Sequence, residues 1–104
     1  MKGTNSWDGS GNLSTEVDYG ETGTGEQACN FGVAVERSNK QVVFVRVNVY
    51  GDLVSLCQTK KLDVGDFVVV SGELMSREWR FSGRRVTLIE IRCKELIINP
   101  GNKK

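Results

Sequence analysis

Four side chains capable of binding chemistry occupy every second position within residues 41–50: Phe44, Arg46, Asn48 and Tyr50. The positions between them hold Val43, Val45, Val47 and Val49. Side chains of a β-strand point alternately to its two faces, so this pattern predicts one all-valine face that is buried and one face that carries the four polar and aromatic groups. Aromatic rings stack on nucleobases and arginine neutralises phosphate, which together predict a surface for single-stranded nucleic acid. The alternative is a protein–protein interface, where aromatic residues are also enriched.

A second candidate for base stacking is Trp79, which stands between Arg77 and Arg80 near a predicted hairpin tip. Tryptophans of a hydrophobic core are rarely found among charges so close to a turn. This context favours a nucleic-acid contact, with packing as the alternative. Trp7 is a weaker candidate, for which ligand contact, packing and an oligomer contact all remain open.

Basic residues cluster in the same part of the chain. Residues 1–36 hold one lysine against six acidic residues, a net charge of −5, while residues 37–104 hold 13 basic against 7 acidic residues, a net charge of +6. Each basic side chain by itself can be a solvated surface charge, but the set favours a groove for a polyanion. The candidate phosphate contacts are Arg37, Lys40, Arg46, Arg77, Arg80, Arg84 and Arg85.

Composition excludes several other kinds of site. The chain contains no histidine, and no Gly-rich phosphate loop or nucleophile–base spacing is present, so an enzyme is not predicted. Cys29, Cys57 and Cys93 are odd in number and far apart, and none belongs to a Cys-x-x-Cys pattern. They predict buried thiols in a reducing compartment, with no metal site and no cofactor.

The bulk numbers describe one small globular domain over residues 1–104. Hydrophobic content is 38% and charged content is 26%, which is typical of a soluble protein. No window approaches the ~20 apolar residues of a membrane span, and the first residues do not read as a signal peptide. We therefore expect no membrane association and a cytoplasmic location, in a protein of bacterial, plasmid or phage origin.

The candidate residues must be positioned by strands. The pattern of apolar residues and turn residues predicts where these strands begin and end. Residues 1–12 are read as a frayed tail or an irregular first strand, and residues 20–26 as a loop. Asp52 is placed to cap a helix, Gly72 predicts a bend or bulge, and residues 81–84 predict a hairpin tip. The predicted strands are 13–19, 28–37, 41–50, 67–80, 86–91 and a short final strand 94–98, with a helix at 52–62.

This order is three strands, one short helix, then two main strands. It predicts an all-β protein, a five-stranded OB-fold barrel with the helix between strands 3 and 4. Another small β-barrel or a sandwich remains the alternative.

Five short segments, in order, resemble a known family. They are Gly11-Asn12-Leu13; Asn30-Phe31-Gly32-Val33-Ala34-Val35; Val47-Asn48-Val49-Tyr50-Gly51-Asp52-Leu53; Val64-Gly65-Asp66 to Gly72-Glu73-Leu74; and Ser76-Arg77-Glu78-Trp79. Together they resemble the bacterial-type single-stranded DNA-binding proteins. The resemblance covers about residues 9–98, the expected core, with short flexible ends outside it.

The resemblance implies single-stranded DNA binding with little sequence specificity, in replication, recombination and repair. It also implies base stacking on Phe44, Tyr50 and Trp79, and a homo-oligomer, more often a tetramer than a dimer. The chain departs from the family in a short loop between strands two and three, where the base-stacking aromatic often found in the family has no clear counterpart. Its first strand is polar and glycine-rich, which puts in doubt the pairing of first strands that builds the family's usual dimer. The family's acidic C-terminal tip is absent, so partners recruited through such a tip are also in doubt. The alternative is a primosome-type replication accessory or protein-interaction module with secondary nucleic-acid binding.

Overall fold

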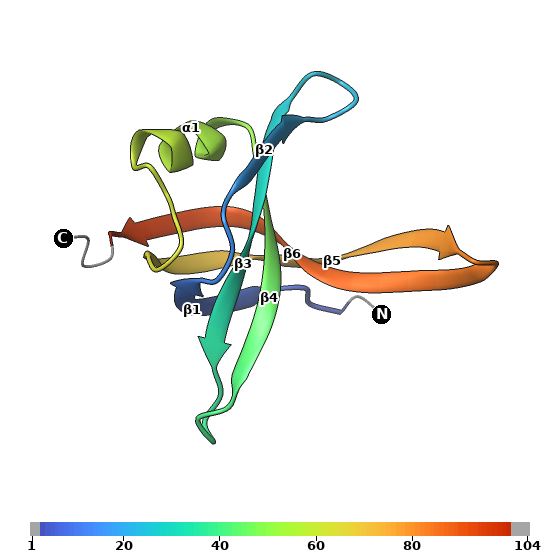
Figure 1. The fold of residues 1–104 in the computed structure, drawn as a ribbon, viewed down its shortest axis with the longest axis horizontal. Coiled ribbons are helices and arrows are strands. Elements are labelled where there is room, and N and C mark those ends of the chain that lie inside the picture. The colour runs from blue at the N-terminus through green and yellow to red at the C-terminus, as the bar shows by residue number, and fades with distance from the viewer. Residues whose placement is uncertain (1–2, 101–104) are drawn as a thin grey trace.

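The computed structural model describes residues 3–100. Their elements in chain order are β1 (Trp7–Leu13), β2 (Asp18–Glu21), β3 (Gln27–Glu36), β4 (Val42–Tyr50), α1 (Asp52–Thr59), β5 (Phe67–Phe81) and β6 (Arg84–Asn99). Of the predicted flexible ends, residues 1–2 and 101–104, with the Lys103-Lys104 tail, lie outside the described residues, whereas Trp7, Asp8 and Asn99 belong to strands β1 and β6. Figure 1 shows α1 at one end of the barrel and the long β5–β6 hairpin leaving it at the other.

The strands form one sheet that closes on itself. Their order is β1-β5-β6-β4-β3-β2, and an additional pairing joins β1 to β3 at Asn12↔Ala34 and Leu13↔Val33. β4 and β6 pair in parallel, whereas the other pairs are antiparallel. The predicted all-β OB-fold barrel is confirmed. When β1 and β2 are counted as two parts of the predicted first strand, α1 lies between the third and fourth strands.

The prediction of a first strand over residues 13–19 is wrong. Residues 14–17 form no strand, and β1 instead begins at Trp7, within the polar segment that was read as a tail or an irregular first strand. Main-chain pairing with β5, from Trp7↔Gly72 to Asn12↔Phe67, decides this outcome. Backbone hydrogen bonds do not require apolar side chains, so the composition of this segment hides the strand.

The hydrophobic core lies inside the barrel and beneath α1. Its fully buried members are Phe31, Val33, Val47, Val49, Val54, Cys57, Val68, Val70 and Ile91. The helix contributes Val54 and Cys57 to this core and ends at Thr59, before the predicted end at residue 62. Asp52 is the first helical residue rather than a cap, because Gly51 occupies the N-cap position and no side chain caps the helix there.

Two predictions about the second half of the barrel are confirmed. The register of β5 and β6 shifts between Ser71 and Gly72, which is the predicted bulge. A side chain at Gly72 would overlap the carbonyl oxygen of Arg92, so this close approach of two backbones requires glycine. The hairpin tip is also where it was predicted, between Phe81 and Arg84. The predicted strands 86–91 and 94–98 are in fact one continuous strand, β6.

The all-valine face of β4 is buried over only half of its length. Val47 and Val49 are inaccessible to solvent and Val45 is half-buried, but Val43 remains 44% exposed. The prediction that Val43 is buried is therefore wrong. The β3–β4 hairpin extends past the end of the barrel (Figure 1), so the first residues of β4 have no core to pack against.

Candidate nucleic-acid interface

Strand register gathers the predicted aromatic and basic residues onto one side of the sheet. Directly opposed residues of neighbouring strands point to the same side, and side chains alternate along each strand. The pairs Asn30↔Asn48, Asn48↔Arg92 and Met75↔Glu90 carry this side across four strands. We call it the aromatic face. Its members include Asn30, Gly32, Phe44, Arg46, Asn48, Tyr50, Glu73, Arg77, Trp79, Phe81, Arg84, Glu90 and Arg92.

Phe44 is the most exposed aromatic side chain of this face, at 72%. The residues opposite Phe44 and Arg46 on β3 are Ala34 and Gly32, which have little or no side chain. No bulky side chain therefore covers the Phe44 ring or the Arg46 guanidinium from the directly opposed positions. An exposed ring beside an exposed cation can stack on a nucleobase and pair with the adjoining phosphate.

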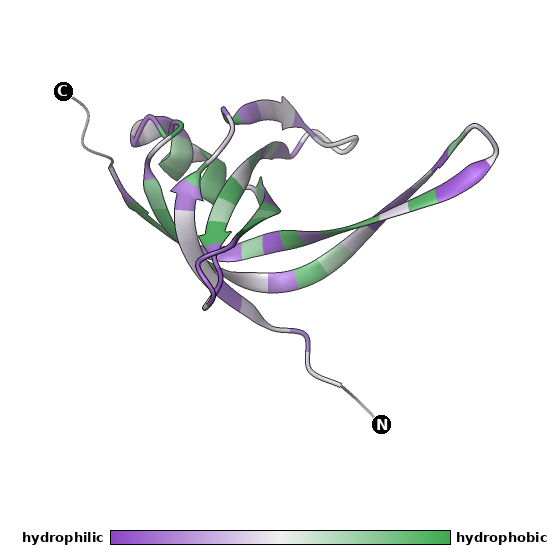
Figure 2. Ribbon diagram, turned by 60° about the horizontal axis from the view of Figure 1, so that its bottom comes forward, coloured by the Kyte–Doolittle hydropathy of each residue, from purple (hydrophilic) through white to green (hydrophobic). Residues whose placement is uncertain are grey.

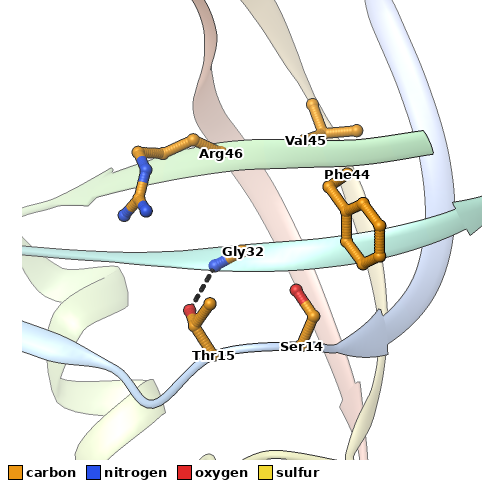
Figure 3. Close-up of a pocket in the computed structure, with 6 residues that line it drawn as sticks. All are labelled: Ser14, Thr15, Gly32, Phe44, Val45 and Arg46. Carbon is orange, nitrogen blue, oxygen red and sulfur yellow. Dashed lines mark hydrogen bonds between the residues drawn. The ribbon is translucent and has the colours of Figure 1, made fainter.

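A pocket of about 320 Å³ lies between these two side chains (Figure 3). Ser14, Thr15 and Gly32 line its other side, and the Gly32 N–H donates a hydrogen bond of 2.7 Å to Thr15 Oγ1. An added Cβ at Gly32 would lie 2.9 Å from Ser14 Oγ, so glycine lets the segment that follows β1 approach β3. Arg46 donates to Asn30 Oδ1, which holds its guanidinium at the edge of the pocket.

Tyr50 is half-buried and has a cation on its ring. The Arg92 guanidinium carbon lies 4.8 Å from the ring centroid, within cation–π range. Arg92 was missed in the sequence, although its alternation with Ile91 and Cys93 along β6 was a usable signal. It adds an exposed positive charge to the aromatic face.

The β5–β6 hairpin carries the remaining predicted residues on both of its sides. Trp79 is 41% exposed, as predicted for a residue outside the core. Arg77 and Arg84 share its side, and Phe81, 69% exposed at the tip, is a further aromatic that had been read only as part of the turn. Figure 2 shows how far this hairpin projects from the barrel.

Arg80 and Arg85 lie opposite each other on the other side of the hairpin, facing away from the side of Trp79. The predicted arginine set is thus divided, and only part of it borders the aromatic face. Arg37 and Lys40 lie elsewhere, at the exposed β3–β4 turn, where Arg37 Nη1 donates to Gln41 Oε1 at 3.3 Å.

Asn48 was predicted as an exposed residue of this face, and that expectation is wrong. Its side chain lies on the predicted side of β4 but is only 8% exposed, and Asn48 Nδ2 donates a hydrogen bond of 2.9 Å to Glu90 Oε1. Trp7 is partly buried and packs against the core, which agrees with the packing alternative for this residue.

The three cysteines are buried and free, as predicted, and they stand on β3, α1 and β6. Burial, together with the neighbouring Cys57 thiol, raises the pKa of Cys93 to about 12. Within residues 3–100 no cluster of three or more acidic, cysteine or histidine side chains could hold a metal ion. Over the same residues no helix is long and apolar enough to cross a membrane.

Residues 10–98 match the single-strand binding protein family. The chain belongs to this family. Two solved structures share the fold of this chain. A Plasmodium falciparum SSB in complex with single-stranded DNA is 23% identical, with a TM-score of 0.79, and the match covers 94% of this chain and 96% of that one. A dimeric N-terminal domain of PriB from Thermoanaerobacter tencongensis is 19% identical, with a TM-score of 0.71 and coverage of 92% and 97%. A comparison with curated protein sequences found no match.

Proposed function

We propose that this protein binds single-stranded DNA with little sequence preference, on the aromatic face, and acts in replication, recombination or repair. The observation that carries the proposal is the exposed Phe44 ring beside Arg46, with a pocket of about 320 Å³ between them. Membership of the single-strand binding protein family supports the ligand class and a binding protein rather than an enzyme.

Bases would stack on Phe44, Tyr50 and Trp79, while Arg46, Arg77 and Arg92 would neutralise phosphates. Every base has a π-face, so stacking of this kind binds all sequences with similar affinity. Arg84, at the hairpin tip on the side of Trp79, would extend the same track. Arg80, Arg85, Arg37 and Lys40 would add long-range attraction to the polyanion without direct contact on this face.

The test is a fluorescence titration with oligo-dT. Stacking of a base on Trp79 should quench its emission, and Trp79→Phe should remove the quenching with little loss of affinity. Trp7→Phe is the matched control, because Trp7 packs against the core, and it should leave the quenching in place. An absence of oligo-dT binding by the unmodified protein would refute the proposed function.

The second candidate function is a primosome-type accessory protein that binds other proteins with this face. The similarity to the PriB domain supports it, with a TM-score of 0.71. Oligo-dT titration separates the two candidates, because the accessory protein would bind DNA only weakly.

We also propose that the protein forms a homo-oligomer, a tetramer rather than a dimer. Size-exclusion chromatography with light scattering, with and without oligo-dT, tests this state.

A further inference from the structure

A buried carboxylate lies where the β5–β6 hairpin leaves the barrel. Glu90 is 2% exposed, and between the hairpin tip and Glu90 no residue of β6 is buried. A carboxylate in such a place is costly unless charges and hydrogen bonds compensate for the lost water. Its partners therefore matter, and they come from two other strands.

Glu90 connects three strands through one side chain. Its Oε1 accepts the hydrogen bond from Asn48 Nδ2 on β4 at 2.9 Å, and its Oε2 pairs with Arg77 Nη2 on β5 at 2.7 Å. β4 and β6 pair through two residue pairs, Val47↔Ile91 and Asn48↔Arg92, and Glu90 adds a polar connection beside the apolar packing of these strands. The Glu90 contacts thus fix how the hairpin is set against the strand that carries Phe44 and Tyr50.

The same contact leaves Arg77 ready to bind. Its side chain is 55% exposed, and Nη2 is the atom that contacts Glu90. A guanidinium has five N–H donors in a rigid fork, so one edge can rest on a carboxylate while other donors face solvent. Those donors lie on the side of the hairpin that carries Trp79. Arg77 is therefore oriented before any phosphate arrives.

We propose that Glu90 is a positioning residue for nucleic-acid binding, acting through Arg77 and through the hairpin base. This inference rests on the proposed function. Its prediction for the affinity is the opposite of what charge alone predicts. By charge alone, removal of a negative charge from a polyanion-binding face should strengthen binding. If Glu90 positions Arg77 and the hairpin, its neutralisation weakens binding instead.

The central experiment is Glu90→Gln with Glu73→Gln as the matched control. Glu73 lies on the aromatic face, on β5, and its side chain is 35% exposed. It forms an ion pair of 3.5 Å with Lys94 and does not take part in the Glu90 contacts described above. We expect Glu90→Gln to lower oligo-dT affinity about fivefold. We expect Glu73→Gln to leave the affinity unchanged or to raise it. An unchanged or higher affinity for Glu90→Gln would overturn the inference.

Variants of Arg77 distinguish a positioning role of Glu90 from a role in stabilising the fold alone. Arg77→Gln should lower the magnitude of the log–log salt slope by about 0.7, the value for one phosphate contact, and Glu90→Gln should lower it by a similar amount. The double variant should bind no more weakly than the weaker single variant, whereas additive losses would contradict action through Arg77. Arg77→Lys keeps the charge at an exposed position and should still lose affinity, even if Glu90→Gln does not fold.

Amide hydrogen exchange of the free protein separates this inference from the proposed function. Glu90→Gln should speed exchange in residues 73–81 and 84–90, and Glu73→Gln should not. If the unmodified protein fails to bind oligo-dT, the proposed function falls, while the exchange rates still decide whether Glu90 holds the hairpin. Equal rates in the Glu90→Gln variant and the unmodified protein would refute that role.

Discussion

Replacing Phe44 by alanine should weaken oligo-dT binding by roughly fivefold to a hundredfold and leave the fold intact. A base–aromatic stack contributes about 1–3 kcal/mol by alanine substitution. With 72% of its surface exposed and the pocket beside it, Phe44 has the most accessible ring of the aromatic face. The loss should appear as a higher dissociation constant with an unchanged number of sites.

The cost in stability should be small, because little of this side chain is buried. A fully buried aromatic removes about 150–250 Å² from water. Phe44 is 72% exposed, which leaves 28% buried, or about 50 Å² of that area. At about 25 cal/mol per Å² this is about 1 kcal/mol. In a domain of this size such a loss lowers the melting temperature by roughly 4–8 °C.

Two control variants on the same strand separate a loss of affinity from a loss of stability. Val43→Ala removes a neighbouring apolar side chain that is 44% exposed on the opposite side of β4, and it should leave the affinity unchanged. Val47→Ala truncates a side chain with 0% exposure and should lower stability by roughly 2 kcal/mol, with little effect on the affinity of the folded protein. Thermal melting and oligo-dT titration of all three variants are the assays.

The reasoning is refuted if Phe44→Ala binds as well as the unmodified protein while Val43→Ala binds more weakly. In that case the two sides of β4 are assigned the wrong way round. Unfolding by Phe44→Ala would contradict it equally, because the exposed fraction leaves no room for so large a loss of stability.

Tyr50→Ala and Trp79→Ala should each weaken oligo-dT binding by a similar factor in the same titration, and unchanged affinity for both would exclude stacking at these positions. Affinity should fall with salt, with a log–log slope of about −0.7 for each phosphate contacted, and a salt-independent dissociation constant would argue against the arginine contacts. Replacement of Cys29, Cys57 and Cys93 by alanine should lower the melting temperature through lost packing, with equal oligo-dT affinity under reducing and non-reducing conditions; dependence of binding on the redox state would contradict this. Unfolding free energy measured in urea should fall as pH rises from 9 toward about 12, because the Cys93 thiol ionises at its usual pKa of 9.0 when unfolded but keeps its proton when folded. A pH-independent free energy across this window would contradict the raised pKa.

The sequence by itself was sufficient for several local features, although not for the cap and the end of α1. Alternation placed Phe44, Arg46 and Tyr50 on one side of a strand, since the period of two is a property of any extended backbone. The hairpin tip and the bulge at Gly72 were predicted because residues with special backbone freedom mark them. The all-β barrel followed from the order of strands and helix.

Tertiary structure decided which side chains are buried. Val43 has the same pattern as Val47, yet it is exposed because β4 extends past the barrel at that end, and no local pattern encodes where a barrel ends. Asn48 has the same pattern as Arg46, yet it is buried and hydrogen-bonded to Glu90. Glu90 lies 42 residues away in the chain, so the sequence around Asn48 does not reveal this contact. Strand β1 was hidden for a related reason, since its pairing with β5 joins segments about 60 residues apart. The period of a strand assigns its two sides, but only contacts distant in sequence determine which residues of each side reach solvent.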